Sequence, residues 1–539
     1  MSRETLETTG REATRPSERE HVTTYIRDLR ARFPQASLGA PLAGLNTERW
    51  TLDEASDLEF LRAVISRLPD TSRPPSYLDV LAVLDAEPAL RAINAPITRN
   101  QGAAKSLRAE GAPAFRGTAE SQRLLARAEK VIPLGSQTFS KSRIQYPQGA
   151  PMLLTHGQGG RVWDVDGNQY VDMVCGLLPV VLGYQDPDVD GAIRAQLGNG
   201  ISFSLATSLE TELAERLVDL IPCAEQVRFG KNGTDATSAA IRLARAFTGR
   251  DHVGVCGYHG WQDWYIGSTS RHKGVPSATR DLTHVLPYND LDAVRALLKS
   301  QDVAAIILEP MNAVEPKDGY LAELKELCHA NGALLVFDEV ITGFRYALGG
   351  AQSMFGVTPD LASFGKAMGN GMPISAIVGR GDVMHEMENV FISGTFGGEA
   401  LSLAASIATI DKMKREPVIE RLWELGTRLA DDSLALAAKH GLGDLFMLMG
   451  RAPWKIMGFK DHPSARKEAL KTLFAHTVLQ QGVLLLASHN VCYAHTDDDL
   501  AVVLRAYDIA FAKLAEELAT GKLEERMPCP PVLPIFTVR

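Results

Sequence analysis

The sequence of 539 residues contains little cysteine, and none of it forms a metal-binding or disulfide-forming motif. Only six cysteines occur, they are scattered between positions 175 and 529, and no two of them form a Cys-x-x-Cys pair. Such scattered single cysteines exclude a disulfide framework or a zinc-cluster domain as the basis of the fold. The cysteine usage therefore predicts reduced thiols, a cytoplasmic location and no bound metal.

Long apolar runs and an excess of positive charge are also missing. The longest candidate run, 173–184, is interrupted by Gly176, Pro179 and Gly183, so it cannot supply the ~18 apolar residues of a membrane-spanning helix. Residues 1–20 are polar without an apolar core, which excludes a secretory signal. Lys and Arg total 56 against 65 Asp and Glu, a net charge of −9. We expect neither a membrane nor nucleic acid among the partners, because nucleic acid requires a basic face.

The remaining composition is that of a globular chain with several structural units. Hydrophobic residues make up 45% and charged residues 22% of the sequence, and the length suggests two to four units. Changes in composition and hydrophobic pattern divide the chain as follows. The predicted parts are an N-terminal extension (1–100), a Gly/Ala/Ser-containing linker (101–118), an N-terminal segment of the enzyme (119–175), a large domain (176–425) and a small C-terminal domain (426–539).

Apolar runs alternate with segments of helical periodicity in the central part of the chain. The predicted strands are 226–229, 252–255, 303–308, 333–337, 361–364 and 374–378. The predicted helices are 234–247, 291–298, 321–330 and 498–517. Strands that alternate with helices form a mostly parallel sheet covered on both faces, with ligands beyond the carboxyl ends of the strands. We therefore predict an α/β fold whose chemistry lies at the strand ends.

The first chemical motif is the turn in FGKNGTDATSAAIRLARAFTG, residues 229–249. A strand ends at Phe229, a polar turn follows, and a helix begins near Thr234. The free N–H groups and the positive dipole end of a helix favour a phosphate. Gly233 would allow close approach of the backbone, and the hydroxyl of Thr234 would donate a further bond. The alternative is an ordinary capped helix without a ligand.

Two further motifs follow strand ends. An apolar strand ends in Asp338 and Glu339, and a buried carboxylate there requires a cation or a donor. Lys366 stands between a short strand and a glycine-rich loop, where burial would lower its pKa and favour a nucleophilic amine. The alternatives are a helix cap or structural ion pair for the two acids and a plain surface residue for the lysine.

Together these motifs resemble the class III, fold-type I aminotransferases, which use pyridoxal 5′-phosphate (PLP). The resemblance covers residues 119–517 and rests on DEVITGFR, on a lysine 28 positions after its first residue (366 − 338), on the upstream NGTDA turn and on the downstream GTFGG segment. It is strongest to glutamate-1-semialdehyde aminomutase and its relatives in sugar biosynthesis. It implies a large, mostly parallel seven-stranded sheet domain and a smaller α+β C-terminal domain, to which this chain adds a mostly helical N-terminal extension.

The resemblance implies roles for the residues around the cofactor ring. Lys366 would form the Schiff base with PLP and later move the proton. Asp338 would pair with the pyridine nitrogen and keep it protonated. Val340 would pack on one face of the ring and Tyr258 on the other, and His259 would also lie at the cofactor site.

The resemblance implies further contacts to the phosphate and the 3′-oxygen. Gly233 and Thr234 would hold the phosphate, although the family's Asn-Ser-Gly-Thr-Glu-Ala turn reads Lys-Asn-Gly-Thr-Asp-Ala here. Glu309 would lie near the 3′-oxygen. Thr395 would reach the phosphate of the neighbouring subunit, which implies a homodimer with shared active sites.

The segment expected to bind the substrate departs from the aminomutase pattern. In 132–143, IPLGSQTFSKSR, Lys141 takes the place of the arginine that binds the substrate carboxylate in the aminomutase, and Arg143 follows closely. A lysine cannot form the planar bidentate contact of an arginine with a carboxylate. Gln137 could instead bind a hydroxyl. The segment therefore favours a sugar or another polyhydroxylated ketone or aldehyde as the carbonyl substrate.

The N-terminal extension carries a second resemblance. Residues 18–94 are similar to the C-terminal end of a cytidylyltransferase-like protein of the spore-coat polysaccharide type, without room for its nucleotide loop. Helices are predicted over 52–68 and 77–85. The apolar face of the first should contain Leu58, Leu61, Val64, Ile65 and Leu68. We expect a remnant or docking segment rather than a nucleotidyltransferase site; an unrelated helical extension is the alternative.

Three functions follow from these patterns. The main expectation is transamination of a carbonyl compound with an amino acid such as glutamate as donor. An intramolecular aminomutase of the glutamate-1-semialdehyde type is the first alternative, and it would need no separate donor. A non-catalytic partner protein with the same fold is the second alternative, although such a protein would be expected to lose Lys366 or Asp338.

Overall fold

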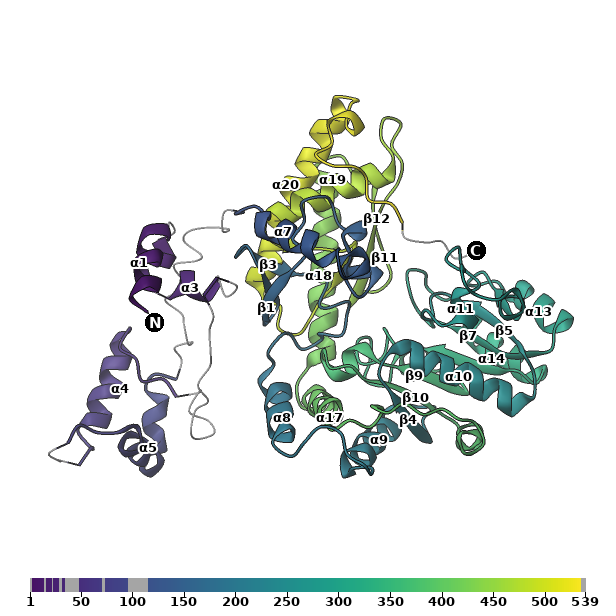
Figure 1. Ribbon diagram of the computed structural model, residues 1–539, viewed down its shortest axis with the longest axis horizontal. Helices are drawn as coiled ribbons and strands as arrows, with labels where there is room; N and C mark the ends of the chain where they lie inside the picture. Colours follow the sequence, from purple (N-terminus) through teal and green to yellow (C-terminus); the bar gives the residue numbers. More distant parts are fainter. Residues whose placement is uncertain are drawn as a thin grey trace. The chain divides into compact units, whose positions relative to one another are not determined.

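The chain divides into two units, residues 1–116 and residues 117–539 (Figure 1). The computed structural model describes residues 2–13, 16–21, 23–28, 32–33, 48–69, 73–95 and 115–534. Among these residues, no helix combines the length and the apolar character needed to cross a membrane. Most of the linker predicted over 101–118 lies outside the described residues.

The first unit is helical where it is described. Its helices are α1 (Arg3–Glu12), α2 (Pro16–Glu20), α3 (Thr24–Asp28), α4 (Ala55–Ile65), α5 (Tyr77–Ala86) and the 3-10 helix η2 (Pro88–Ala92). Capping boxes begin both longer predicted helices, with Glu54 and Asp57 at α4 and Ser76 and Asp79 at α5. These reciprocal side-chain bonds satisfy backbone donors that a helix start leaves free.

The apolar face predicted for α4 is partly wrong. The buried core of this part consists of Phe60, Val64, Leu84 and Leu90, with Leu61 and Leu68 packed against it. Leu58 and Ile65 remain 37% and 64% exposed. The helix stops at Ile65, and packing against α5 and η2 selects Phe60 and Val64, one turn apart, as the inward stripe.

The second unit is built around a seven-stranded sheet in the order β4-β10-β9-β8-β7-β5-β6. Only β10 runs antiparallel to its neighbours; the other pairs are parallel. The strands are β4 (Gln226–Gly230), β5 (His252–Cys256), β6 (Thr283–Val285), β7 (Val303–Leu308), β8 (Leu334–Asp338), β9 (Leu361–Phe364) and β10 (Ser375–Gly379). The six predicted strands are all present, and the prediction missed only the short edge strand β6.

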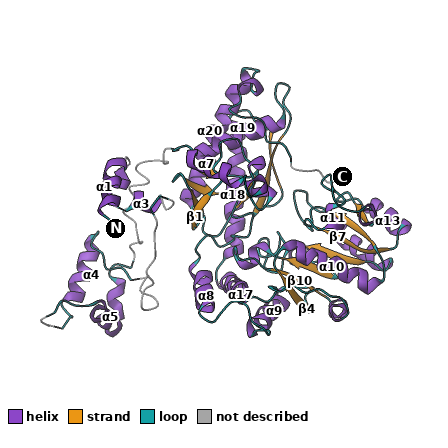
Figure 2. Cartoon of the chain, in the orientation of Figure 1, coloured by secondary structure: helices purple, strands orange, loops and turns teal. Residues whose placement is uncertain are grey.

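Helices cover both faces of this sheet (Figure 2). The central strands are buried on both sides, as in β7, where all six residues are buried. On one face pack α10 (Gly233–Thr248), α11 (Asp263–Ile266) and α16 (Gly381–Met384). On the other face pack α9 (Ser208–Leu220), α13 (Leu291–Ser300), α14 (Tyr320–Ala330) and α17 (Ala400–Arg415). The short elements that connect them are α12 (Ser277–Arg280), α15 (Ala351–Phe355), η6 (Lys366–Gly369) and η7 (His385–Glu388).

A second body combines the start and the end of this unit. A four-stranded sheet has the order β1-β2-β3-β13, and its β13 pairs in parallel with β3. A three-stranded sheet has the order β11-β12-β14. The strands are β1 (Leu154–Gln158), β2 (Arg161–Asp164), β3 (Gln169–Asp172), β11 (Phe446–Met449), β12 (Trp454–Phe459), β13 (Val483–Leu484) and β14 (Ser488–Asn490).

The helices of this part are long and mostly C-terminal. They are α7 (Ala119–Ala128), α18 (Val418–Lys439), α19 (Lys467–Gln480) and α20 (Asp497–Ala519), with the 3-10 turns η3 (Pro133–Gly135), η4 (Phe139–Lys141), η5 (Arg143–Gln145) and η8 (Glu524–Arg526). The remaining helix, α8 (Pro187–Leu197), packs against α17 instead. The predicted boundary at 425/426 falls inside α18. The β3–β13 pairing makes residues 154–172 part of the same sheet as the C-terminal strand.

Candidate active site

Lys366 lies at the carboxyl end of a central strand of the large sheet. It follows β9 after one glycine and begins the turn η6, with its backbone in the left-handed region at φ 41°. Residues with a Cβ rarely adopt this conformation, and those that do concentrate at functional sites. Desolvation by the surrounding protein lowers the pKa of Lys366 from its usual value. More of the amine is then neutral and nucleophilic near neutral pH.

Asp338 ends the neighbouring strand β8 and faces a buried histidine. Its Oδ2 lies 2.8 Å from Nδ1 of His259, and its Oδ1 accepts the backbone N–H of Val340 at 3.1 Å. The other ring nitrogen of His259, Nε2, lies 3.0 Å from the carbonyl oxygen of Cys256. The histidine is 1% exposed, so these contacts fix the orientation of the carboxylate at the strand end. Asp338 is also the main charge that opposes the lowered pKa of Lys366.

The turn predicted to bind a phosphate begins the 16-residue helix α10. Asn232 is the N-cap, and Asp235 caps it reciprocally, so the first N–H groups of the helix are ordered around Gly233 and Thr234. A Cβ on Gly233 would lie 2.8 Å from a methyl group of Val340. Position 233 therefore requires glycine, because the turn passes close to Val340, the residue predicted to cover one face of the cofactor ring.

The loop after β5 brings Tyr258 to the same region. Its ring is 49% exposed and meets Tyr265 edge-on, with 5.6 Å between ring centroids. Glu309, at the end of β7, accepts the backbone N–H of Tyr258 at 3.3 Å and the amide of Asn312 at 3.4 Å. Burial, followed by the charge of Asp338, raises the pKa of Glu309. A carboxyl group with a raised pKa can share a proton with a neighbouring oxygen.

The same loop also closes on Thr234. A Cβ on Gly260 would lie 2.3 Å from Thr234 Oγ1, and one on Gly257 would lie 2.5 Å from Glu309 Oε2. Both glycines have positive φ, at 102° and 99°, so this loop can run close to the site only with glycine at these positions. The structure thus brings Gly233, Thr234, Tyr258, His259, Glu309, Asp338, Val340 and Lys366 to the carboxyl ends of neighbouring strands.

Two residues of the DEVITGFR motif have structural partners. Glu339 is fully buried and accepts the N–H groups of Ala351 and Gln352 at 2.7 and 2.8 Å. Glu339 therefore caps the start of α15. For this acid, the structure agrees with the helix cap that the sequence analysis gave as one alternative. Arg345 is fully buried and was not singled out from the sequence. It donates to the carbonyl oxygens of Leu178, Val491 and Pro453 at 2.9, 2.9 and 3.2 Å.

The residues expected to meet the substrate lie in the segment that contains η4 and η5. Gln137 and Lys141 are exposed. The guanidinium of Arg143 forms an ion pair with Glu129. Arg143 and Arg271 both border a hollow of about 770 Å³, and Arg271 lies over the ring of Phe139, 5.5 Å from its centroid. The chain thus already provides a carboxylate partner for Arg143.

Thr395 lies on an exposed loop after β10. It borders a hollow of about 290 Å³ together with residues of β4, of the start of α10 and of the loop 392–397. Nearby on this loop, Phe391 and Phe396 are 85% and 59% exposed. The role of Thr395 toward a neighbouring subunit stays a prediction.

One group of sulfur and nitrogen atoms in the described part of the chain is spaced closely enough to hold a metal ion. Ligand atoms of Cys175, Cys492 and His495 lie within 4.8 Å of one another, and all three residues are buried. Arg345 is electrostatically coupled to both thiols. A buried guanidinium beside this group disfavours a further cation, so the structure gives no support for a metal here.

Comparison with known proteins decides the family. The model of the family "Aminotransferase class-III" matches residues 145–500. The chain is a class III aminotransferase. It is 36% identical over 413 residues to the 3-aminobutyryl-CoA aminotransferase of Cloacimonas acidaminovorans, and the match covers 74% of this chain and 98% of that protein.

Solved structures agree with this assignment. The FumI protein of Sphingopyxis sp. MTA144, in its PLP internal aldimine form, superposes with a TM-score of 0.70 at 30% identity and covers 76% of this chain and 98% of its own. A glutamate-1-semialdehyde aminomutase of Pseudomonas aeruginosa superposes with a TM-score of 0.67 at 25% identity, covering 74% and 95%. The predicted fold class, the class III assignment and the cofactor class are confirmed.

The site of this aminotransferase fits PLP. The N–H groups at the start of α10, where Gly233 passes close to Val340, can bind a phosphate, while Asp338 and the amine of Lys366 lie at neighbouring strand ends. When bound, PLP supplies an electron sink for the electrons left at carbon when a proton is removed. The chain's own part is to hold the cofactor at α10 and to hold negative charge at Asp338. The neutral Nζ of Lys366 can then take up a proton and return it.

Proposed function

We propose that this class III aminotransferase transfers an amino group from an amino acid, most simply glutamate, to a separate carbonyl compound. The proposal is supported by the pairing of Lys366, whose pKa is lowered by burial, with Asp338, whose orientation is fixed by His259. A chain that had lost catalysis would have no reason to retain both groups in this arrangement. The alternative of a non-catalytic partner protein is therefore disfavoured.

The acceptor that we propose has no free carboxylate next to its reacting carbonyl. The observation that carries this choice is the ion pair between Arg143 and Glu129. A guanidinium already matched by a carboxylate of its own chain is a poor clamp for the carboxylate of the acceptor, so we propose that the carboxylate of the donor amino acid is bound by another group of the site. Lys141 stands at the position of the aminomutase arginine and offers only a point charge. Both features also argue against the intramolecular aminomutase.

A sugar or other polyhydroxylated ketone or aldehyde is our first candidate for this acceptor. Gln137 is exposed in the same segment, and its amide can both donate to and accept from a hydroxyl group. A second candidate is the 3-oxo group of a 3-oxoacyl thioester. It is favoured by the 36% identity to a 3-aminobutyryl-CoA aminotransferase, and a thioester likewise carries no carboxylate near the reacting carbon.

A screen of donors and acceptors tests the proposal. Purified holoenzyme is incubated with glutamate as the donor and either a keto sugar or pyruvate as the acceptor. In a separate reaction that tests the reverse direction, 3-aminobutyryl-CoA is the donor and 2-oxoglutarate is the acceptor. Amino transfer to the keto sugar or from the thioester, with little transfer to pyruvate, supports the proposal. Turnover of glutamate-1-semialdehyde without any donor would favour the aminomutase instead, and preference for pyruvate would refute the choice of acceptor.

We further propose a homodimer with shared sites and a cytoplasmic location. Several large apolar side chains are exposed near the site, which suits an interface with a second copy. They are Phe203, Leu205, Trp261, Phe391 and Phe396. All six cysteines are free thiols, the usual state in a reducing compartment. The first unit is proposed as a remnant of a cytidylyltransferase-like protein without a nucleotide site.

A further inference from the structure

The turn that carries Lys366 is bounded at both ends by a residue in the left-handed region that is not glycine. Lys366 begins η6 at φ 41°, and Asn370 ends it at φ 42° and ψ 43°. Asparagine tolerates this conformation better than most residues with a Cβ. Two strained positions within five residues persist only where the surroundings hold them, so the contacts of Asn370 determine how this turn is held.

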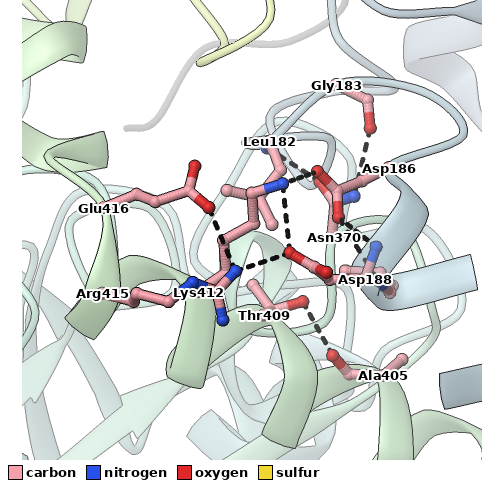
Figure 3. Close-up of polar contacts among 11 residues, drawn as sticks. Leu182, Gly183, Asp186, Asp188, Asn370, Ala405, Thr409, Lys412, Arg415 and Glu416 are labelled. Atoms are coloured by element: carbon pink, nitrogen blue, oxygen red, sulfur yellow. Dashed lines mark hydrogen bonds and ion pairs between the residues drawn. The ribbon is translucent and has the colours of Figure 1, made fainter. Parts of the chain in front are cut away.

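The side chain of Asn370 binds the backbone of a distant segment at two points (Figure 3). Its Oδ1 accepts the N–H of Leu182 at 2.9 Å, and its Nδ2 donates to the carbonyl oxygen of Gly183 at 3.1 Å. The two partners differ in kind, one donor and one acceptor, so they define the orientation of the amide. An amide that bridges backbone groups of two successive residues holds the turn more firmly than a single hydrogen bond would.

The segment that Asn370 binds is itself anchored on two further sides. Tyr184 exchanges backbone hydrogen bonds of 2.8 and 2.9 Å with Gly159, next to β1. Asp186 caps α8 and forms a buried ion pair of 2.7 Å with Lys412 of α17, as Figure 3 shows. Lys412 also lies 3.3 Å from Asp188. The segment 182–186 is therefore held in place by several contacts, and the side chain of Asn370 connects this segment to the turn that carries Lys366.

We propose that Asn370 is a positioning residue for Lys366, because its amide ties the turn of the lysine to Leu182 and Gly183. The proposal rests on the assignment of Lys366 as the cofactor-binding lysine. The charged groups that face Lys366 are Asp338, Glu309 and Arg345, from the ends of β7 and β8 and the loop after β8. None of these charged groups takes part in the two hydrogen bonds of Asn370. We therefore expect Asn370 to determine the direction of Lys366 Nζ and its shielding from water, and not to act through charge.

The variant that isolates this role is Asn370→Gly. Glycine adopts φ 42° without strain, so the substitution removes the two bridging bonds while it permits the turn itself. A matched control is Asn289→Gly. Asn289 also has positive φ, at 65°, and also bridges two backbone groups: it donates to Glu315 O and accepts from Lys317 N, both at 2.8 Å. It lies before α13 and has no contact with η6.

The test uses the full-length holoenzyme and reads the cofactor as well as the rate. The pH midpoint of the absorbance change of bound PLP is measured together with kcat and KM for the amino donor. For Asn370→Gly we expect the midpoint to move upward by about half a pH unit or more, because the nitrogen of Lys366 that is joined to PLP becomes less shielded from water, which favours its protonated, charged form. We also expect kcat to fall about tenfold with little change in KM, the equivalent of one or two neutral hydrogen bonds.

The control separates positioning from a merely structural effect. Asn289→Gly should lower the melting temperature as Asn370→Gly does, yet leave the pH midpoint and kcat at wild-type values. If Asn370→Gly also leaves both unchanged, the proposal is wrong whatever happens to the melting temperature. Should Asn370→Gly fail to fold, Asn370→Ser replaces the amide with a shorter neutral side chain that cannot bridge both Leu182 and Gly183, and it must show the same shift in smaller measure. A Lys366→Ala variant that still holds PLP after borohydride reduction would instead refute the lysine assignment itself.

Discussion

Replacing Asp338 with asparagine tests the electrostatic core of the site while nearly preserving its shape. The carboxylate accepts from His259 at 2.8 Å and from the backbone of Val340 at 3.1 Å. An asparagine keeps one acceptor oxygen for the N–H of Val340 and presents its NH2 group to His259, whose Nδ1 can accept it in the tautomer that donates from Nε2 to the carbonyl oxygen of Cys256. The substitution therefore removes the negative charge while the neighbouring hydrogen bonds stay satisfied.

The magnitude of the effect follows from the burial of the group. Asp338 is 6% exposed, and removing one partner of a buried charge pair costs about 3–5 kcal/mol. If that charge acts mainly when the cofactor ring accepts electrons, the cost falls on the barrier. At about 1.4 kcal/mol per factor of ten, we expect kcat for the first half-reaction to fall about 10²- to 4 × 10³-fold.

Stopped-flow measurement of the half-reaction with the amino donor, at saturating PLP, measures this loss. Asp360→Asn provides a matched control in the same sheet. Asp360 is 1% exposed, lies 2.9 Å from His329 Nε2 and accepts from Arg380 at 2.6 Å, at the opposite end of β9. The control should reduce thermal stability and leave kcat near the wild-type value. A rate for Asp338→Asn within fivefold of wild type, with PLP bound, would refute the assignment of Asp338.

Three further predictions concern other parts of the molecule. Lys366→Ala should abolish turnover and the borohydride-stable attachment of PLP while circular dichroism shows an intact fold; retained attachment would contradict it. Thr395→Ala should weaken PLP binding in a dimer, measured by PLP release and by sedimentation, and a fully active monomer would rule out the shared site. Acid should open α4: hydrogen bonds from Arg49 hold the pKa of Asp57 below its usual value, so its stabilisation is present above that usual value and is lost as the pH falls below it. The protection factors of the α4 amides, which are the exchange rates corrected for the intrinsic rate at each pH, should then fall below about pH 4, and protection that stays unchanged down to pH 3 would count against this role.

The elements of the large sheet could be predicted because each leaves a local pattern. Buried parallel strands are continuous apolar runs, and the polar residues that follow them mark the carboxyl edge. Asp338 and Lys366 were found in this way, and the structure places their strands side by side, with Asp338 paired to Ser363 in the ladder. The cofactor turn at Gly233 was likewise found from a strand, a glycine and a helix start.

The parts that could not be predicted depend on contacts between distant segments. Arg345 follows the DEVITG residues as a charge, but nothing local shows that its partners are carbonyl groups near positions 178, 453 and 491. The pairing of β13 with β3 joins two short strands from opposite ends of the unit. Asn370 looks like part of a flexible loop until its bonds to Leu182 and Gly183 are seen. In α4 the choice between Leu58 and Phe60 as the buried residue was made by α5 and η2 rather than by periodicity.

Removing the first unit tests whether it takes part in the transamination. The second unit begins with contacts of its own: Asn168 donates to Gly117 O at 2.8 Å, and Thr118 donates to Gly149 O at 2.7 Å. The apolar residues of α4, α5 and η2 form a core among themselves. Deletion of residues 1–116 therefore removes this core completely and leaves the cores of the second unit intact.

We therefore expect the truncated chain, starting at Gly117, to bind PLP and to carry out the first half-reaction within about twofold of the full-length rate, because all the residues placed at the site belong to the second unit. PLP absorbance and single-turnover kinetics measure both properties. The matched control is the full-length Lys366→Ala variant, which retains the first unit and should lack the half-reaction. A truncated protein that folds, as judged by an unchanged melting transition of the second unit, but loses the half-reaction would show that residues 1–116 contribute to the active site. In that case the first unit could not be a remnant without a role in the chemistry.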